Sequence, residues 1–214
     1  MAAKYSHIIW DWNGTLLNDV DRCLHAINIL LKRRNLPQLS DTNAYRSVFC
    51  FPVIEYYRHV GFDLDNEPFA AIAAEYMELY HGNAMGPIVL YDHVENVLKR
   101  IKEAHIIQTV LSASHIDHLL SQIGMFPIAP FFSEILGITD IYAAGKMDIG
   151  KAYMNRIQPK KALMIGDTVH DYEVAQALGI DCLLIAQGHQ SHATLSACPV
   201  PVVSDIQEAI DIIA

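Results

Sequence analysis

Three short apolar segments, each followed by a polar residue, do most to limit the folds open to this chain. They span residues 7–10, 106–111 and 162–165, and they lead into Asp11, Ser112 and Gly166-Asp167. Short apolar runs that end in turn-forming residues are typical of buried strands. Helical patterns separate the segments beyond residue 87, and strands that alternate with helices predict a parallel sheet. We therefore expect an α/β fold with a Rossmann-like parallel sheet core and helices on both faces.

The region between the first and second of these segments has a different pattern. Apolar side chains recur there at helical spacing, and glycines and prolines divide the region into separate helices. The predicted helices span residues 19–34, 52–60 and 67–81. We expect residues 17–86 to form an all-helical cap inserted after the first strand, and residues 1–16 and 87–214 to form the core. Such an insert is expected above the carboxyl ends of the strands, where ligands bind in open α/β sheets.

The charge balance argues against a nucleic-acid partner. The chain has 15 lysine and arginine residues against 24 aspartate and glutamate residues, which gives a formal net charge of -9. Its basic cluster, residues 32–34, lies at a predicted helix end, where cations interact favourably with the helix dipole. Nucleic-acid binding proteins usually carry a basic stripe instead. Any positive potential that holds an anionic ligand must therefore be local.

The cysteines and the apolar segments predict a protein of the cytoplasm. The four cysteines are scattered without a CxxC pair, which is typical of free thiols in a reducing compartment. The N-terminus has no apolar stretch with a cleavage site, and no apolar run approaches the roughly 20 residues that cross a bilayer. We expect no membrane partner, and the sequence does not predict the oligomeric state.

The polar residues at the strand ends are expected to meet. In a parallel sheet the carboxyl ends of the strands lie on one edge, so Asp11, Ser112 and Asp167 converge although they are far apart in the sequence. Each of them alone is explained as a helix cap or a turn residue, because aspartate and serine favour such positions. All three together, in their local contexts, favour a functional site.

Four motifs, in this order along the chain, resemble those of the haloacid dehalogenase-like hydrolases. They are Asp11-Trp12-Asn13-Gly14-Thr15, which is similar to the family's Asp-Xaa-Asp-Gly-Thr signature, then Ser112, then Lys146, and finally Gly166-Asp167 with Asp171 four residues later. Any one motif is weak, but together they span nearly the whole chain. The resemblance is strongest to the phosphoglycolate phosphatase-like branch, which has a helical cap after the first motif. It implies a phosphatase that acts on a small phosphorylated metabolite.

The resemblance also implies a nucleophile and a metal site. Asp11 would attack phosphorus and form an aspartyl-phosphate. Mg²⁺ would be bound by Asp11, the backbone carbonyl of Asn13 and Asp167, and Asp171 would orient Asp167 or a water on the metal. Mg²⁺ prefers a few carboxylates, waters and a substrate phosphate as ligands, and this set of oxygen donors suits it.

The remaining motif residues would hold the phosphoryl group. By the resemblance, Ser112 and the amide of Ala113 would donate hydrogen bonds to it, and Thr15 belongs to the same substrate-binding set. Lys146 would offset the negative charge shared by the nucleophile and the phosphate. Lys151, one turn further along the predicted helix, is the alternative. A lysine at a helix start is unfavourable for the helix dipole, which favours a functional role for Lys146.

One departure from the family pattern concerns the chemistry itself. The second acid of the first motif is replaced by Asn13. In the phosphatases this acid protonates the leaving oxygen and then activates water, and an amide does neither. General acid–base help is typically worth about 10²–10⁴-fold in rate.

Three functions remain open because of Asn13. The first is a phosphatase that acts on better leaving groups or uses water, His170 or a cap residue in place of the acid. The second is a weak or inactive phosphatase-like protein that binds a phosphorylated ligand or partner. The third is a hydrolase of C–P or C–halogen bonds, which would need a cap lysine such as Lys32 or no metal at all. We rank them in this order.

Several side chains outside the motifs are further candidates. Arg46 and Arg58, on the predicted cap, could bind a substrate carboxylate in a bidentate manner. Tyr56 either lines the substrate pocket or packs inside the cap. Trp12 is expected at the entrance of the site. His189 lacks a third metal ligand at suitable spacing and is expected to be an ordinary polar loop residue.

Overall fold

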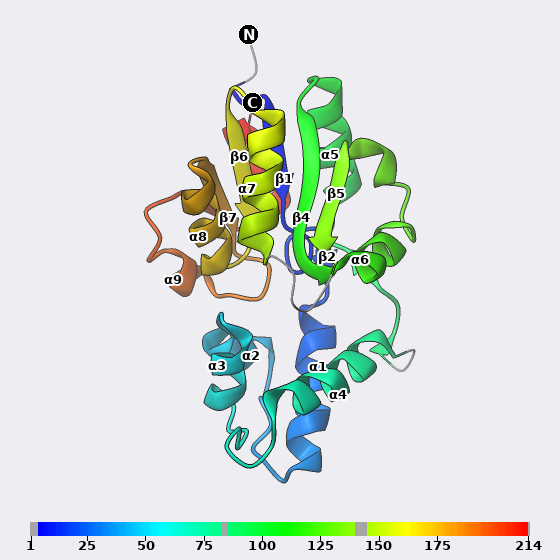
Figure 1. Cartoon of the computed structure of the whole chain (residues 1–214), viewed down its shortest axis with the longest axis vertical. Coiled ribbons are helices and arrows are strands. Elements are labelled where there is room, and N and C mark those ends of the chain that lie inside the picture. Colours follow the sequence, from blue (N-terminus) through cyan, green and yellow to red (C-terminus); the bar gives the residue numbers. More distant parts are fainter. Residues whose placement is uncertain (1–3, 83–84, 140–144, 214) are drawn as a thin grey trace.

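A parallel sheet of six strands forms the centre of the molecule in the computed structural model, which describes residues 4–82, 85–139 and 145–213. The strand order is β5-β4-β1-β6-β7-β8, and each neighbouring pair is parallel (Figure 1). The α/β sheet expected from the sequence is therefore confirmed. The strands are β1 (His7–Trp10), β4 (Ile107–His115), β5 (Glu134–Ile138), β6 (Ala162–Gly166), β7 (Asp181–Ile185) and β8 (Val202–Val203).

Strand β1 lies between β4 and β6 and is buried along its whole length. A strand covered on both faces needs apolar side chains at successive positions, which explains the continuous apolar run at residues 7–10. Trp10 aligns with Val110 of β4 and with Ile165 of β6. This register brings Asp11, Ser112 and Asp167, which follow shortly after these positions, to one edge of the sheet.

Helices cover both faces of the sheet, as expected. On β1, Ile8 and Trp10 belong to one hydrophobic cluster and Ile9 to another, because successive side chains on a strand point to opposite faces. The first cluster includes side chains of α5, α6 and α10, and the second includes side chains of α7, α8 and α9. The helices are α5 (Val94–Glu103), α6 (Ile116–Ile123), α7 (Lys146–Ile157), α8 (Val169–Leu178), α9 (His192–Leu195) and α10 (Ile206–Ile213).

Four helices follow β1 in the chain and have a hydrophobic cluster of their own. They lie beyond the carboxyl ends of the strands (Figure 1). A short antiparallel ribbon, β2 (Leu17–Asn18) with β3 (Val89–Leu90), joins this region to the sheet. The prediction of a wholly helical region missed β2, because a strand of two residues has no periodicity to detect. The division of the chain into two domains stays a prediction. The helices are α1 (Val20–Arg33), α2 (Thr42–Val48), α3 (Val53–His59) and α4 (Phe69–His81).

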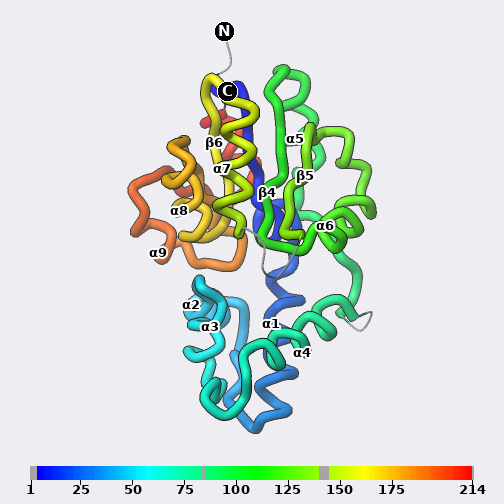
Figure 2. The backbone as a smooth tube through the Cα atoms, in the orientation of Figure 1, coloured from blue at the N-terminus to red at the C-terminus, as the bar shows by residue number. Residues whose placement is uncertain are grey.

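The cap helices are tied to the loop that follows β7. Arg46 of α2 donates hydrogen bonds to the carbonyls of Gln187 and Gly188, at 2.7 and 2.8 Å. Gln190 donates to the carbonyl of Phe49 at 3.2 Å. Figure 2 traces the two segments as they approach each other, although more than 130 residues separate them along the chain. These hydrogen bonds connect the helical region to the loop at the carboxyl edge of the sheet.

Two local boundaries differ from those expected. Strand β4 continues to His115 with an irregularity after Leu111, and α6 begins only at Ile116. A serine that follows an apolar strand favours a helix start at Ser112. The Ser112 hydroxyl instead accepts a hydrogen bond from the amide of Ser114 at 3.1 Å, and the chain stays extended there. Two short helices, α2 and α9, were not expected. Their first turns are capped by Asp41 and Ser191.

Two observations bear on the compartment. Cys23, Cys50, Cys182 and Cys198 are all free thiols. Among the described residues, no helix combines the length and the apolar character that a membrane crossing requires. The cytoplasmic location stays a prediction.

Trp12 lies in the core and not at the entrance of the site, which corrects the expectation above. It is fully buried, and its indole Nε1 donates a hydrogen bond to Oε1 of Gln122 at 2.8 Å. An indole NH buried without an acceptor would lose its bonds to water without replacement, so the pair satisfies two core groups at once.

The variant Trp12→Phe is expected to lower the free energy of unfolding by about 1–3 kcal/mol, because it leaves a buried Gln122 oxygen without its donor. Urea denaturation followed by circular dichroism measures the change. In the double variant Trp12→Phe/Gln122→Leu the loss should be smaller than the sum of the two single losses. Additive losses would contradict the assigned hydrogen bond.

Candidate active site

Three aspartates meet at the carboxyl edge of the sheet. Asp11 follows β1, Asp167 follows β6 and Asp171 lies in the first turn of α8. Each offers a carboxylate oxygen within 4.8 Å of the others, and all three residues are buried. Of the three residues expected to converge, Asp11 and Asp167 meet in this cluster, and Ser112 lines the same cavity as Asp11.

Lys146, the first residue of α7, lies among these carboxylates. Its Nζ donates hydrogen bonds to Oδ1 of Asp11 and, at 2.6 Å, to Oδ1 of Asp171. Its side chain is 3% exposed, and a lysine is buried to this degree only when its charge is paired. Lys151, the alternative from the sequence, is exposed to solvent. Of the two lysines, the geometry brings Lys146 to the carboxylates.

The carboxylates do not share the positive charge of Lys146 equally. Burial, which the charge of Lys146 offsets only in part, raises the pKa of Asp11 to about 7. Burial also raises the pKa of Asp167 to about 6, although the charge of His189 lowers it. The pKa of Asp171 is lowered, because Lys146 outweighs the effect of burial. Asp11 and Asp167 therefore lose their protons only at a higher pH than ordinary carboxyl groups do.

A divalent cation fits this cluster. The donors are carboxylate oxygens, which hard cations such as Mg²⁺ prefer. The excess of buried negative charge over the one lysine is the condition that a cation would relieve. Asp11 and Asp167, together with the backbone carbonyl of Asn13, are the residues that would hold it.

Thr15 and the loop after β7 hold Asp167 in place. The hydroxyl of Thr15 donates to Oδ1 of Asp167 at 2.9 Å, and the amide of His189 donates to Oδ2 at 2.7 Å. Thr15 is fully buried and its hydroxyl is engaged, so its position suits it to orienting the carboxylate and not to the substrate contact expected from the sequence. Gly14, with φ of 73°, lies so close that a Cβ atom there would be 2.3 Å from Asp167.

A second buried ion pair lies beside the first cluster. Nε2 of His189 is 3.3 Å from Oδ1 of Asp19, and Nδ1 shares a hydrogen bond of 3.0 Å with the hydroxyl of Tyr45. Burial lowers the pKa of His189, but the charge of Asp19 outweighs burial and raises it to about 9. The expectation that His189 is an ordinary polar loop residue is wrong. Neither Asp19 nor His189 belongs to a motif that local sequence could reveal.

The amide of Asn13 is fixed by hydrogen bonds on both sides. Its Nδ2 donates to Oδ2 of Asp19 at 2.8 Å and to the hydroxyl of Tyr80 at 2.9 Å. Its Oδ1 accepts from the hydroxyl of Ser114 at 2.8 Å. Asn13 thus connects the end of β1 to cap helix α4 and to β4. The residue that replaces the family's acid has a structural role of its own.

A cavity of about 320 Å³ connects the carboxylate cluster with the cap. Its polar end is formed by the sheet edge, and its other end is formed mostly by aromatic side chains of the cap. His170 lines it too and stacks on Phe51 at 4.7 Å between ring centroids. The polar end includes Asp11, Asn13, Ser112, Ala113, Lys146 and Asp171.

The two arginines proposed for substrate binding lie outside this cavity. Arg46 donates to two backbone carbonyls of the loop after β7. Arg58 is exposed and pairs with Glu55 on its own helix. The sequence predicted a helix at Arg58 but not the short helix α2 that carries Arg46, and it could not predict which way either side chain points. Tyr56 both lines the cavity and packs inside the cap.

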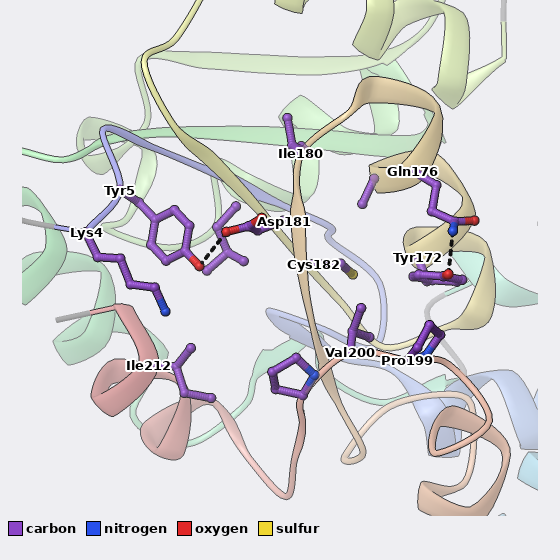
Figure 3. Close-up of a pocket in the computed structure, with 13 residues that line it drawn as sticks. Lys4, Tyr5, Tyr172, Gln176, Ile180, Asp181, Cys182, Pro199, Val200 and Ile212 are labelled. Carbon is purple, nitrogen blue, oxygen red and sulfur yellow. Dashed lines mark hydrogen bonds between the residues drawn. The ribbon is translucent and has the colours of Figure 1, made fainter.

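A second cavity, of about 390 Å³, lies at the opposite end of the sheet (Figure 3). Asp181, the first residue of β7, lines it and accepts a hydrogen bond from the hydroxyl of Tyr5 at 3.0 Å. The carboxylate cluster does not reach it. This second cavity is therefore not where the strand-end residues meet.

The match to known families decides the assignment. Residues 8–185 match the family described as haloacid dehalogenase-like hydrolase. The chain belongs to this family. The match begins in β1 and ends with β7, so it includes all three carboxylates and Lys146.

Individual relatives agree with the family in fold. A phosphoglycolate phosphatase of Caulobacter vibrioides is 24% identical over 190 residues, which is 85% of this chain and 79% of that protein. A haloacid dehalogenase-like family hydrolase of Streptococcus pneumoniae has a TM-score of 0.83 at 19% identity, over 98% of this chain and 99% of that chain. Protein tyrosine kinase A of Mycobacterium tuberculosis has a TM-score of 0.78 at 22% identity, over 98% of each chain. Proteins named for different reactions thus share this fold, and the site must decide the function.

Magnesium chloride is expected to raise the melting temperature more at about pH 8 than at about pH 5.5, because cation ligands must first lose their protons. The folded protein binds protons more tightly at Asp11 than an ordinary carboxyl of pKa 3.8 does. Without a cation its stability therefore falls as the pH rises through about 7. A bound cation should reverse this trend.

Differential scanning fluorimetry with and without magnesium chloride measures the shift, and Asp167→Asn is the control in which the shift should be small at either pH. Equal shifts at both pH values, or an undiminished shift in the control, would count against a cation at these carboxylates.

Proposed function

We propose that the protein is a Mg²⁺-dependent phosphatase that hydrolyses a small phosphomonoester through an aspartyl-phosphate on Asp11. The observation that carries the proposal is the position of Asp11, whose carboxylate lies beside Asp167 and Asp171 and is bonded to Lys146. A buried carboxylate with a cation on one oxygen leaves its other oxygen to act as a nucleophile. The named phosphoglycolate phosphatases among its relatives support the reaction class.

In the proposed reaction, Asp11 is the nucleophile and other residues of the site stabilise the phosphoryl group. An oxygen of Asp11 forms a bond to phosphorus as the bond from phosphorus to the leaving oxygen breaks. Lys146 and the donors at Ser112 and Ala113 offset the charge on the phosphoryl oxygens. A water then hydrolyses the aspartyl-phosphate and restores Asp11. Mg²⁺, when bound at Asp11, Asp167 and the carbonyl of Asn13, would further neutralise the phosphoryl charge.

The leaving oxygen receives no proton from position 13. An amide has no acidic proton at neutral pH, and both of its polar atoms are already hydrogen-bonded. His170 lines the cavity, but its ring stacks on Phe51 and its Nδ1 is 3.3 Å from a carboxylate oxygen of Glu173. The enzyme therefore suits leaving groups that depart with little help.

A second candidate function follows from the same residue. Because Asn13 replaces the acid, the site could bind a phosphorylated ligand or partner with little turnover. C–P bond cleavage is less well supported, since Lys32, the cap lysine considered for it, is exposed to solvent. Lys146 is bonded to two carboxylates and so is held as a charged ammonium, which cannot form an imine.

The variant Asp11→Asn should abolish magnesium-dependent phosphate release, because the amide lacks the nucleophilic oxygen. Release of inorganic phosphate from acetyl phosphate, p-nitrophenyl phosphate and a sugar phosphate measures this. A loss of about 10⁴-fold or more is expected, as for other nucleophile deletions. Unchanged turnover in the variant would sink the proposal. Absence of turnover in the parent protein, with phosphate raising its melting temperature, would favour the binding function.

The variant Asn13→Asp should raise turnover of alkyl phosphates by about 10²-fold or more, because it restores a general acid. The new carboxyl group would lie close to Asp19, whose Oδ2 is 2.8 Å from Nδ2 of Asn13. A neighbouring negative charge raises a carboxyl pKa and so keeps a proton available for the leaving oxygen. Glycerol 3-phosphate is the substrate to use. No gain in a folded variant that still binds Mg²⁺ would count against this role of position 13.

A further inference from the structure

The end of the cavity far from Asp11 is an aromatic chamber. Side chains from α2, α3, α4 and the loop between α2 and α3 form it, and their rings contact one another edge to face or in stacks. Phe49 lies 5.4 Å from Tyr45 and 5.2 Å from Tyr56 between ring centroids. Met77 adds a flexible thioether to the wall. Such a surface favours a flat apolar group, which aromatic rings and methionine sulfur bind well.

The chamber offers no free cation to an acidic group. Among the described residues that line the cavity, Lys146 is the only lysine or arginine, and both Asp11 and Asp171 accept its hydrogen bonds. Three histidines also line the cavity, and each lies beside a carboxylate of its own. His189 is paired with Asp19, His115 lies beside Asp117, and His170 lies beside Glu173. A leaving group with a carboxylate would therefore be buried beside acidic residues without a partner, which is costly. The geometry favours an uncharged organic part.

The absence of an acid at position 13 independently favours leaving groups that depart without a proton. A phenol has a pKa near that of the tyrosine side chain, about 10, so an aryl oxide departs from phosphorus without prior protonation far more readily than an alkoxide does. Asn13 cannot supply a proton, and an aryl leaving group does not require one. The shape of the cap and the chemistry of position 13 thus select the same substrates.

One polar group in the chamber wall lacks a partner. The hydroxyl of Tyr56 is buried and has no hydrogen-bond partner within the described part of the chain. Because this hydroxyl has no accessible surface, it is not open to a ligand in the cavity and sets no requirement on the substituents of the ring.

We propose, on the basis of the phosphatase function above, that the substrates are small aryl phosphates whose uncharged ring packs in the aromatic chamber. An oxygen of Asp11 forms the new bond to phosphorus, and the aryl oxide leaves with the electron pair of the broken P–O bond and takes a proton from water. A second water releases inorganic phosphate from Asp11. The cavity of about 320 Å³ has room for one substituted ring beside the phosphoryl group.

A comparison of substrates tests the proposal on the full chain with Mg²⁺. The value of kcat/KM for phenyl phosphate should exceed the values for 2-phosphoglycolate and glycerol 3-phosphate by about 100-fold or more, given the typical contribution of a general acid. If either alkyl phosphate is hydrolysed as well as phenyl phosphate, and Asp11→Asn abolishes that turnover, the substrate class is overturned and the phosphatase function stands. If no ester and no acetyl phosphate is hydrolysed, both are overturned.

A matched pair of variants tests the chamber itself. Ala73 of α4 lines the cavity, whereas Ala74 is exposed on the same helix and does not line it. Ala73→Phe should lower kcat/KM for phenyl phosphate by about tenfold or more, the effect of displacing one buried ring. Acetyl phosphate, which is small and needs no acid, should be affected less than about twofold, and Ala74→Phe should change neither substrate by more than about twofold. Equal effects of Ala73→Phe on both substrates, or none, would overturn the proposal.

Inhibition of the unmodified enzyme provides a test that depends on no variant. Phenylphosphonate and methylphosphonate carry the same anionic group and cannot be hydrolysed through a P–O ester bond. Phenylphosphonate should inhibit turnover of acetyl phosphate at concentrations about tenfold lower or more, because its ring is buried on binding. Equal inhibition by the two compounds would show that the ring gains nothing from the cap and would overturn the proposal.

Discussion

The excess of negative charge buried at the carboxyl edge of the sheet is the constraint on which the rest of the site depends. Three aspartates share a single lysine, and burial raises the pKa of Asp11 and Asp167. Such a cluster destabilises a folded protein unless something compensates it. Lys146 compensates part of it, and the proposed divalent cation would compensate the rest. The strand register, the glycine at position 14 and the loop after β7 all hold these carboxylates where repulsion would otherwise separate them.

The second ion pair, between Asp19 and His189, is neutral overall, so it adds no net negative charge beside the site in a chain whose formal net charge is -9. His189 carries its positive charge near neutral pH because Asp19 stabilises it. The pair joins Asp19, directly before α1, to the loop after β7. The hydroxyl of Tyr45, on α2, shares a hydrogen bond with the same histidine. Arg46 of α2 also binds the loop after β7, because it donates hydrogen bonds to two backbone carbonyls there. The cap is thus held by buried polar contacts, and its apolar side chains remain free to line the cavity.

The sequence predicted the part of the site that local patterns encode. Asp11, Ser112 and Asp167 each follow an apolar segment, and a parallel sheet must bring such positions together. It could not predict Asp19 or His189, because their pairing depends on contacts across 170 positions of the chain, and neither lies in a recognisable pattern. For Arg58 the helical pattern predicted the helix but not the direction of the side chain, and for Arg46 it predicted neither. Trp12 was misplaced because an aromatic residue beside a nucleophile suits an entrance and a core equally well.

The hydrogen bonds of Asn13 give this residue a structural role that the sequence alone does not indicate. Taken alone, it is a catalytic acid that has been lost. In the structure its amide donates to Asp19 and accepts from Ser114, and a carboxylate in its place would face the carboxylate of Asp19. Two unprotonated carboxylates at that separation repel each other strongly. The residue types at positions 13 and 19 therefore depend on each other. An amide at one position permits a charged residue at the other, and that charge anchors His189 and the cap. A site of this kind has an aromatic chamber and donates no proton to the leaving group, and these two properties favour the same leaving groups.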